Sequence, residues 1–496
     1  MRRQFAIIAM SSATAFLIYF VVGMLACKAD TYEFELSKEV AHVNSNKLNV
    51  NTLKKAADEH QKPTQVLKEN KPVWKEPEKS YLTVKTGPDA LWINGRDLNR
   101  IYDFKNMRIY DLNSSASTYM ERSLYADLAT RQSDLRNRLA LHDAIGRTIK
   151  GKHANHILDD FFNEERYALT LPDRHSGYVL TKEKLGDADV YNFGKLIVTS
   201  VIPGSQSVSG DKLRQFSRFL IYATHLHPDI REDIEKMERL PDRFMCLLEN
   251  HPISKERCTF TLKKVTPGDF AGQVPAGYTQ ARDPHSPLFS VYPCIKDRGG
   301  EPPADLRQQT IEYYKKAVEK KNYLDALLAV SEYGLQTGEN LTNEMSAIKD
   351  QIKEDAECKK LIAGLRTPRT EQEAMLALGS LDSINRTHSS KSYLIDIFRA
   401  NLIVAMNERG LANLATKQDA DPSATFVKVL KINPFLAGVY HDLGEYLDQT
   451  DKHTYAWECY ELAHKFYPKH PFMKDVMERE HELSESFPQF FYGDKL

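Results

Sequence analysis

A run of 22 residues without a charge, Phe5 to Ala26, stands near the start of the chain behind two arginines. At 1.5 Å per residue, a helix of this length can cross a hydrocarbon layer about 30 Å thick. Three fates fit the segment: a secretory signal peptide, a lipoprotein leader cut before Cys27, or a retained anchor with its basic end in the cytoplasm. All three predict export. We therefore expect residues 1–27 to be a signal peptide or N-terminal membrane anchor, with the bulk of the chain extracytoplasmic (periplasmic in a bacterium).

The residues behind the uncharged run are polar. Residues 28–80, of which "VNSNKLNVNTLKKAADEHQKPTQVLKEN" is typical, are rich in Lys, Glu and Asn. So few apolar residues cannot bury enough surface to offset the entropy lost on ordering. We expect a polar flexible linker over 28–80, and a tether of this kind favours the retained anchor.

Length and composition limit the number of domains and the kinds of partner that the chain can have. A length of 496 residues predicts two or three domains, and 67 basic against 68 acidic residues give no electrostatic reason to expect a nucleic-acid partner. Six cysteines are too few for a disulfide scaffold of this size. Cys246, Cys258 and Cys294 lie close together in sequence, and a Cys246–Cys258 disulfide and buried free thiols both remain open.

Residues 81–300 alternate between strand-like and helix-like patterns. Two short β-like runs flank Gly87-Pro88-Asp89 and end at an Asn94-Gly95 turn, whereas the leucines from Leu124 onward recur at helical spacing. The segment 266–303 is dense in Pro and Gly and predicts the end of this part. We expect a mixed α/β domain of unknown type over 81–300.

Residues 301–496 have a helical pattern throughout. Thr370 and Glu373 have the spacing of a capping box, which predicts a helix beginning after Thr370. The whole chain is therefore expected to be mainly α with an α+β middle domain.

One stretch of this helical part, residues 437–470, carries small and aromatic residues at recurring positions. These are Tyr440, Leu443, Gly444, Ala456, Tyr460, Ala463 and Pro468. The set resembles the 34-residue tetratricopeptide repeat, and residues 403–436 and a stretch around Ala326 match it more weakly. The resemblance implies a C-terminal α-solenoid of tetratricopeptide-like helix hairpins.

The same resemblance implies a binding role. It places His441, Glu445 and Asp448 on the groove that holds extended peptides or partner helices in that family. The predicted function is an exported, membrane-tethered scaffold that binds a protein partner or peptide segment, with the membrane contacted by the N-terminal helix.

The alternative is an extracytoplasmic hydrolase with its site in residues 81–300 and the repeats as an accessory. His225, His227 and Asp229 resemble the metal-binding motif of metallo-β-lactamase-like hydrolases, in which a strand ends in His-x-His-x-Asp-His. Ile230 stands where the next histidine is expected. Apolar residues before the motif recur at three or four, which instead predicts a helix ended by Pro228 and a second helix capped by Asp229.

Sequence motifs for catalysis are otherwise absent. The chain has no HExxH, no nucleophile elbow and no Cys/His signature, and no motif that indicates a cofactor. The sequence therefore favours a binding protein over an enzyme.

Overall fold

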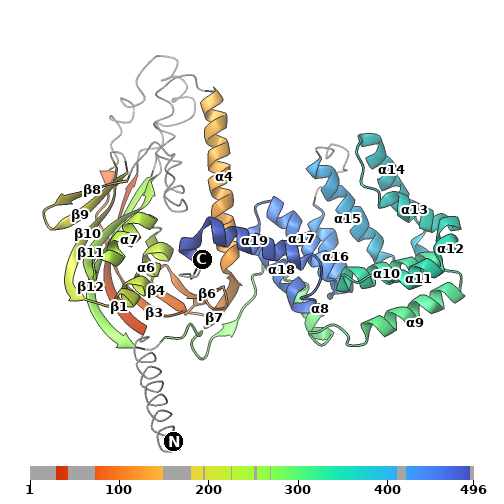
Figure 1. Ribbon diagram of the computed structural model, residues 1–496, viewed down its shortest axis with the longest axis horizontal. Coiled ribbons are helices and arrows are strands. Elements are labelled where there is room, and N and C mark those ends of the chain that lie inside the picture. The colour runs from red at the N-terminus through yellow and green to blue at the C-terminus, as the bar shows by residue number, and fades with distance from the viewer. Residues whose placement is uncertain are drawn as a thin grey trace, which may run out of the picture. The chain divides into compact units, whose positions relative to one another are not determined.

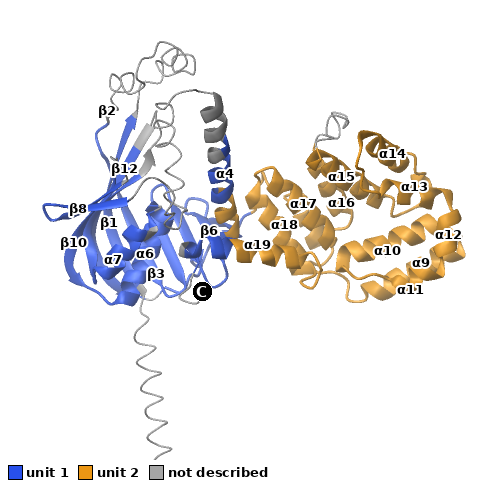
Figure 2. Ribbon diagram, turned by 45° about the horizontal axis from the view of Figure 1, so that its top comes forward, with its two compact units in different colours: residues 1–124, 131–281, 483–496 blue, residues 125–130, 282–482 orange. Residues whose placement is uncertain are grey.

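The computed structural model describes residues 29–42, 73–148, 180–193, 196–224, 226–250, 254–268, 270–409 and 421–491. The chain divides into two compact units (Figure 2). Unit 1 comprises residues 1–124, 131–281 and 483–496, and unit 2 comprises residues 125–130 and 282–482. The second unit therefore begins near residue 282 rather than at the predicted residue 301.

Unit 1 is built on a 13-stranded sheet formed by the described residues. The strands are β1 (Ala29–His42), β2 (Val73–Trp74), β3 (Glu78–Gly87), β4 (Ala90–Gly95), β5 (Asn99–Asp103), β6 (Arg108–Asn113), β7 (Thr118–Ser123), β8 (Leu180–Leu185), β9 (Ala188–Phe193), β10 (Leu196–Ser207), β11 (Arg239–Asn250), β12 (Ser254–Gly268) and β13 (Thr279–Gln280). Their order is β13-β7-β6-β5-β4-β3-β1-β12-β11-β10-β9-β8, with β2 paired to β1. All pairs are antiparallel except β13 with β7.

Strand β1 joins two sequential meanders, β3 to β7 on one side and β8 to β12 on the other. Its sequence alternates, so that Tyr32 and Phe34 are buried on one face. On the other face Glu35 forms ion pairs with Lys79 (3.2 Å) and Lys263 (3.0 Å) on the two neighbouring strands. Residues 29–42 were expected to belong to the polar linker; they form the central strand instead.

Helix α6 (Gly210–Thr224) supplies the other half of the unit 1 core. It contacts β3, β4 and β11 and is followed by α7 (Pro228–Lys236), and Figure 1 shows both helices within the curve of the sheet. Phe216 and Phe219 are buried on α6 and lie within 6.3 Å, ring centroid to centroid, of Phe34 and Phe244. This aromatic cluster fixes α6 on the sheet.

Unit 2 is helical in the part of the chain that the structure describes. Its elements are α8 (Tyr292–Asp297), α9 (Leu306–Glu319), α10 (Tyr323–Thr337), α11 (Thr342–Ala347), α12 (Lys349–Glu354), α13 (Ala356–Gly364), α14 (Glu371–Asp382), η2 (Arg386–His388), α15 (Tyr393–Glu408), α16 (Ser423–Ile432), α17 (Ala437–Gln449) and α18 (His453–Phe466). Helix α4 (Leu124–Thr148) and helix α19 (Met473–Ser486) each belong partly to both units, and η5 (Pro488–Phe490) belongs to unit 1. Thr370 caps α14 as the sequence predicts, because its side chain accepts from the backbone N–H of Glu373 at 3.2 Å.

The expected fold class, mainly α with an α+β middle domain and a C-terminal α-solenoid of tetratricopeptide-like hairpins, is wrong. The first half of the described chain forms one large sheet, and the helices that follow range from six residues in α11 to 16 in α15. In a solenoid each hairpin contacts only its neighbours along the chain. Here α10 packs against α17, and Asn433 donates to Glu332, 101 residues away in sequence, at 2.6 Å.

The residues behind the repeat resemblance do form a helix hairpin. Tyr440, Leu443 and Gly444 are buried on α17, and Ala456, Tyr460 and Ala463 are buried on α18, with Pro468 just beyond that helix. The small residues at these positions are explained by the close crossing of α17 and α18 alone. The resemblance to the tetratricopeptide repeat receives no support beyond this one hairpin.

The expected transmembrane helix and signal segment, Phe5 to Ala26, lie outside the described residues. Among the residues that the structure describes, no helix is long and apolar enough to cross a membrane.

Candidate functional site

The residues of the proposed metal motif lie around the start of α7. His227 is the N-cap of α7, and its Nδ1 accepts from the backbone N–H of Asp229 at 3.2 Å. Burial lowers the pKa of His227, although the neighbouring Asp229 acts in the opposite direction. His225 lies outside the described residues. The spacing correctly predicts helices before and after Pro228, but His227 rather than Asp229 caps the second one.

In the part of the chain that the structure describes, no group of three or more His, Cys, Asp or Glu side chains could hold a metal ion. Among these described residues, none joins His227 and Asp229 as a third metal ligand.

The predicted groove residues His441, Glu445 and Asp448 lie on α17 and face other parts of unit 2. His441 is buried, and its ring stacks on Phe472 with centroids 4.6 Å apart. Glu445 accepts from the hydroxyl of Tyr460 at 3.0 Å. These side chains take part in packing between α17, α18 and the segment that begins α19.

Asp448 is the most constrained of the three. Its carboxylate accepts from Arg479 of α19 and lies 2.6 Å from Nδ1 of His453 on α18. Burial raises the pKa of Asp448, but the hydrogen bond from His453 and the charge of Arg479 outweigh it, so that the pKa lies below its ordinary value. The group ties three helices together.

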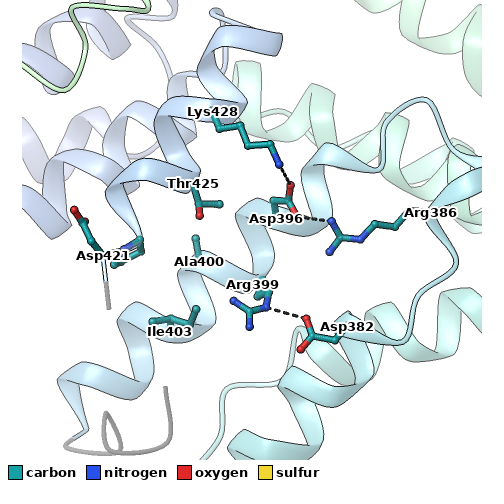
Figure 3. Close-up of a pocket in the computed structure, with 10 residues that line it drawn as sticks. Asp382, Arg386, Asp396, Arg399, Ala400, Ile403, Asp421, Thr425 and Lys428 are labelled. Atoms are coloured by element: carbon teal, nitrogen blue, oxygen red, sulfur yellow. Dashed lines mark hydrogen bonds and ion pairs between the residues drawn. The ribbon is translucent and has the colours of Figure 1, made fainter. Parts of the chain in front are cut away.

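A cleft of about 340 Å³ opens elsewhere on unit 2, between the end of α14, η2, α15 and α16 (Figure 3). It is lined by Asp382, Arg386, Asp396, Arg399, Ala400, Ile403, Asp421, Pro422, Thr425 and Lys428. We call these residues the charged cleft. Local sequence explains the arrangement, because residues three or four apart on α15 share one face and turn Asp396, Arg399, Ala400 and Ile403 to the opening together.

The charges of the cleft pair with one another. Asp396 accepts from Arg386 and lies 3.2 Å from the ammonium of Lys428, so that one carboxylate serves two cations. Arg399 donates through Nε to Asp382 at 2.9 Å. Figure 3 shows both sets of pairs on the walls of the cleft.

The exposed fractions of these side chains differ and decide which of them a ligand can reach. Lys428 is 68% exposed and Asp382 is 53% exposed, whereas the side chain of Asp396 is only 16% exposed. Lys428 and Asp382 therefore present one cation and one carboxylate to solvent. Asp396 is less accessible and holds the side chains of Arg386 and Lys428 in place.

The chemistry of the charged cleft suits binding. Among the described residues that line it, the hydroxyl of Thr425 is the sole alcohol, and no histidine or cysteine is present. Two carboxylates of the cleft, Asp382 and Asp396, are held in ion pairs with cations of the same lining. The lining offers paired charges to a ligand, and its apolar residues Ala400, Ile403 and Pro422 are buried.

A second, more open depression of about 450 Å³ is lined by Tyr323, Asp350, Gln351, Glu354 and Asp355. Asp355 caps α13 by accepting from the backbone N–H of Cys358 at 2.8 Å, and Asp350 lies 3.4 Å from Lys353. Two of the three carboxylates of this depression, those of Asp350 and Asp355, are therefore explained by contacts with residues three positions along the chain.

The sequence did not reveal the charged cleft. Asp396 and Arg399 are three residues apart, which is the ordinary spacing of charges on a solvated helix face. What distinguishes them is that Arg386, Asp382 and Lys428 come from other elements to the same place, and no local pattern encodes that meeting.

Comparison with known proteins gives no family. No family model matches the chain, and no curated protein matches it. A solved structure described as "Lipid-protein interactions in lipovitellin" aligns over 93% of this chain and 56% of its own, at 8% sequence identity and a TM-score of 0.17. The chain spans little more than half of that structure, and a TM-score this low supports no conclusion about fold or function.

Proposed function

We propose that the protein binds a polypeptide partner through the charged cleft of unit 2, in a non-catalytic role. The observation that carries the proposal is that Lys428 and Asp382 lie exposed on one cleft and are paired there with less exposed partners. The partner segment would carry a carboxylate for Lys428 and, a few residues away, a cation for Asp382.

The energetics of the cleft favour exchange of partners. An exposed ion pair stabilises a protein by about 0–1 kcal/mol, so that opening the pairs of Lys428 and of Asp382 costs little. A bound segment would replace those pairs with its own charges, while Ala400, Ile403 and Pro422 are already buried in the free chain. Recognition therefore depends on the exposed charges of Lys428 and Asp382, which govern the orientation and specificity of the bound segment more than its affinity.

The volume of the cleft limits the size of the contact. A space of about 340 Å³ lies at the small end of the range of ligand sites, about 300–1,000 Å³, and holds one or two side chains. The cleft would therefore anchor a short segment of a larger partner.

The experiment compares capture of partners by charge variants of the full chain. Lys428→Glu and Asp382→Lys each place a like charge against the partner, and each is expected to reduce capture by about tenfold or more, which corresponds to about 1.4 kcal/mol. Lys353→Glu, on exposed α12, is the matched control and leaves capture unchanged. Equal capture by all three variants, with circular dichroism spectra unchanged, would exclude the cleft as the binding site.

A further inference from the structure

Two cysteines of unit 1 stand directly opposite each other on neighbouring strands. Cys246 on β11 pairs in register with Cys258 on β12. Two residues along each strand, Phe244 pairs with Phe260, and their rings stack with centroids 4.6 Å apart. Because side chains two apart on a strand share a face, the two cysteines lie on the same face of the sheet as these rings.

The strand spacing matches the reach of a disulfide. Directly opposite residues of an antiparallel pair have Cα atoms about 4.5–5.5 Å apart, and a disulfide spans Cα separations of about 4.4–6.8 Å. The cysteines are free thiols in this structure, and the hydroxyls of Thr224 and Thr199 lie within hydrogen-bonding reach of the Cys246 thiol.

Burial determines when such a bond can form. Cys246 is 1% exposed and Cys258 is 2% exposed in the folded sheet. Burial raises the pKa of each thiol to about 12, so that little of the reactive thiolate is present near neutral pH. The thiols therefore react while the sheet and α6 are still assembling, and the bond is shielded from reductants afterwards.

We propose that Cys246 and Cys258 form a cross-strand disulfide that locks β11 to β12 when the chain folds in the presence of a small-molecule disulfide such as oxidised glutathione. One protein thiolate attacks the glutathione disulfide, releases one glutathione thiolate and leaves a mixed disulfide. The second protein thiolate attacks the protein sulfur of that mixed disulfide and releases the other glutathione thiolate. The two protons lost by the cysteines are taken up by the two glutathione molecules, which are thereby reduced.

The expected consequence is a more stable unit 1. Closing the loop of 13 residues from Cys246 to Cys258 in the unfolded chain raises the unfolding midpoint of a domain of this size by roughly 6–12 °C. The effect belongs to this cysteine pair, since Cys358 and Cys459 are buried in unit 2.

The test refolds the full chain from denaturant, either with oxidised and reduced glutathione or with a thiol reductant alone. Remaining thiols are alkylated under denaturing conditions, and the masses of the intact chain and of its unreduced peptides are measured. Refolding with glutathione is expected to leave two cysteines unalkylated, to remove about 2 Da from the chain, and to give a linked peptide pair that joins Cys246 with Cys258.

The controls separate this bond from general oxidation. The midpoint increase is expected to vanish in Cys246→Ser and Cys258→Ser and to persist in Cys358→Ser. If a serine variant does not fold, the peptide map of the unmodified chain still decides the matter. Alkylation of both cysteines after oxidative refolding, a link to a different cysteine, or a linked form with an unchanged midpoint would each overturn the proposal.

Discussion

Replacing Gly444 by alanine tests the packing of α17 against α18. A Cβ atom at Gly444 would lie 2.5 Å from Cε1 and 2.9 Å from Cδ1 of Tyr460. Ordinary carbon–carbon contact is about 3.5–4.0 Å, so the ring must move by about 1 Å. The ring is 1% exposed, makes an edge contact with Trp457 at 5.7 Å and donates from its hydroxyl to Glu445, so it has no free space to enter.

The magnitude follows from two opposing effects. Overpacking of a buried site costs about 1–3 kcal/mol, whereas alanine in place of glycine favours a helix by about 1 kcal/mol. We expect Gly444→Ala to lower the free energy of unfolding of unit 2 by about 0–2 kcal/mol. Gly379→Ala, in the middle of α14, is the matched control, because a Cβ there has no atom within 4 Å; it is expected to raise stability by about 0.5–1 kcal/mol.

Urea unfolding followed by tryptophan fluorescence measures this difference. Substituting Trp74 and Trp92 by Phe leaves Trp457, which is buried in unit 2, as the reporter. Unfolding of Gly444→Ala at the same or a higher urea concentration than Gly379→Ala would refute the close-packing argument. Shortening the neighbour in Tyr460→Leu is expected to remove most of the penalty of Gly444→Ala, as a double-mutant cycle would show.

Further predictions concern the two cores and their pH dependence. Phe34→Ala, in the aromatic cluster of unit 1, is expected to lower the free energy of unfolding by about 3–5 kcal/mol in urea titrations, whereas Glu33→Ala on the exposed face changes it by less than about 0.5 kcal/mol; equal effects would contradict β1 as a core strand. Glu332→Ala leaves the donors around this buried carboxylate unpaired and is expected to cost about 3–5 kcal/mol in thermal unfolding, more than Glu332→Gln, and a neutral result would show that the network is open to water. Burial lowers the pKa of His470 and of His227 below the ordinary value of 6.5. Near and below pH 6.5 the unfolded chain therefore binds more protons than the folded chain, and the free energy of unfolding is expected to fall as the pH decreases from 7.5 to 5.5. A free energy of unfolding that stays constant or rises toward pH 5.5 in urea titrations would contradict this prediction.

The sequence predicted local elements where short-range chemistry determines them. The capping pair Thr370 and Glu373 marks the start of α14, and the apolar spacing before Pro228 marks α6. The small residues Gly444 and Ala456 correctly indicated a close helix hairpin. In each case the signal lies within a few residues, and the contact that it predicts lies there too.

Long-range pairing could not be predicted in this way. Strand β1 pairs with β12, more than two hundred residues away, and the many charged residues of β1 gave it the average composition of a linker. Its alternation of Tyr32, Glu33, Phe34 and Glu35 was a usable signal, because the charges within these four residues fall on one face of the strand. The prediction of a solenoid was wrong because a single helix hairpin is enough to place small residues at the positions where the repeat has them. The packing of α10 on α17 joins distant parts of the chain, and no short-range sequence pattern indicates it.

The charged cleft depends wholly on such distant meetings. Asp396 on α15 forms ion pairs with Arg386 of η2 and Lys428 of α16. In the sequence, each of these charged residues taken alone has the pattern of an exposed surface residue. Sequence patterns locate charged faces on helices, but tertiary packing decides which faces enclose a cavity.

Photo-crosslinking from inside the cleft is the most direct test of the proposed function. A photoreactive amino acid at Thr425, on the lining of the charged cleft, is compared with the same residue at Gly379, which is exposed on α14. We predict that the full chain forms a crosslink to one protein partner from position 425 and not from position 379, and that Lys428→Glu abolishes it. A crosslink that is equal from both positions, or that persists unchanged in Lys428→Glu, would contradict the proposal that the charged cleft binds the partner.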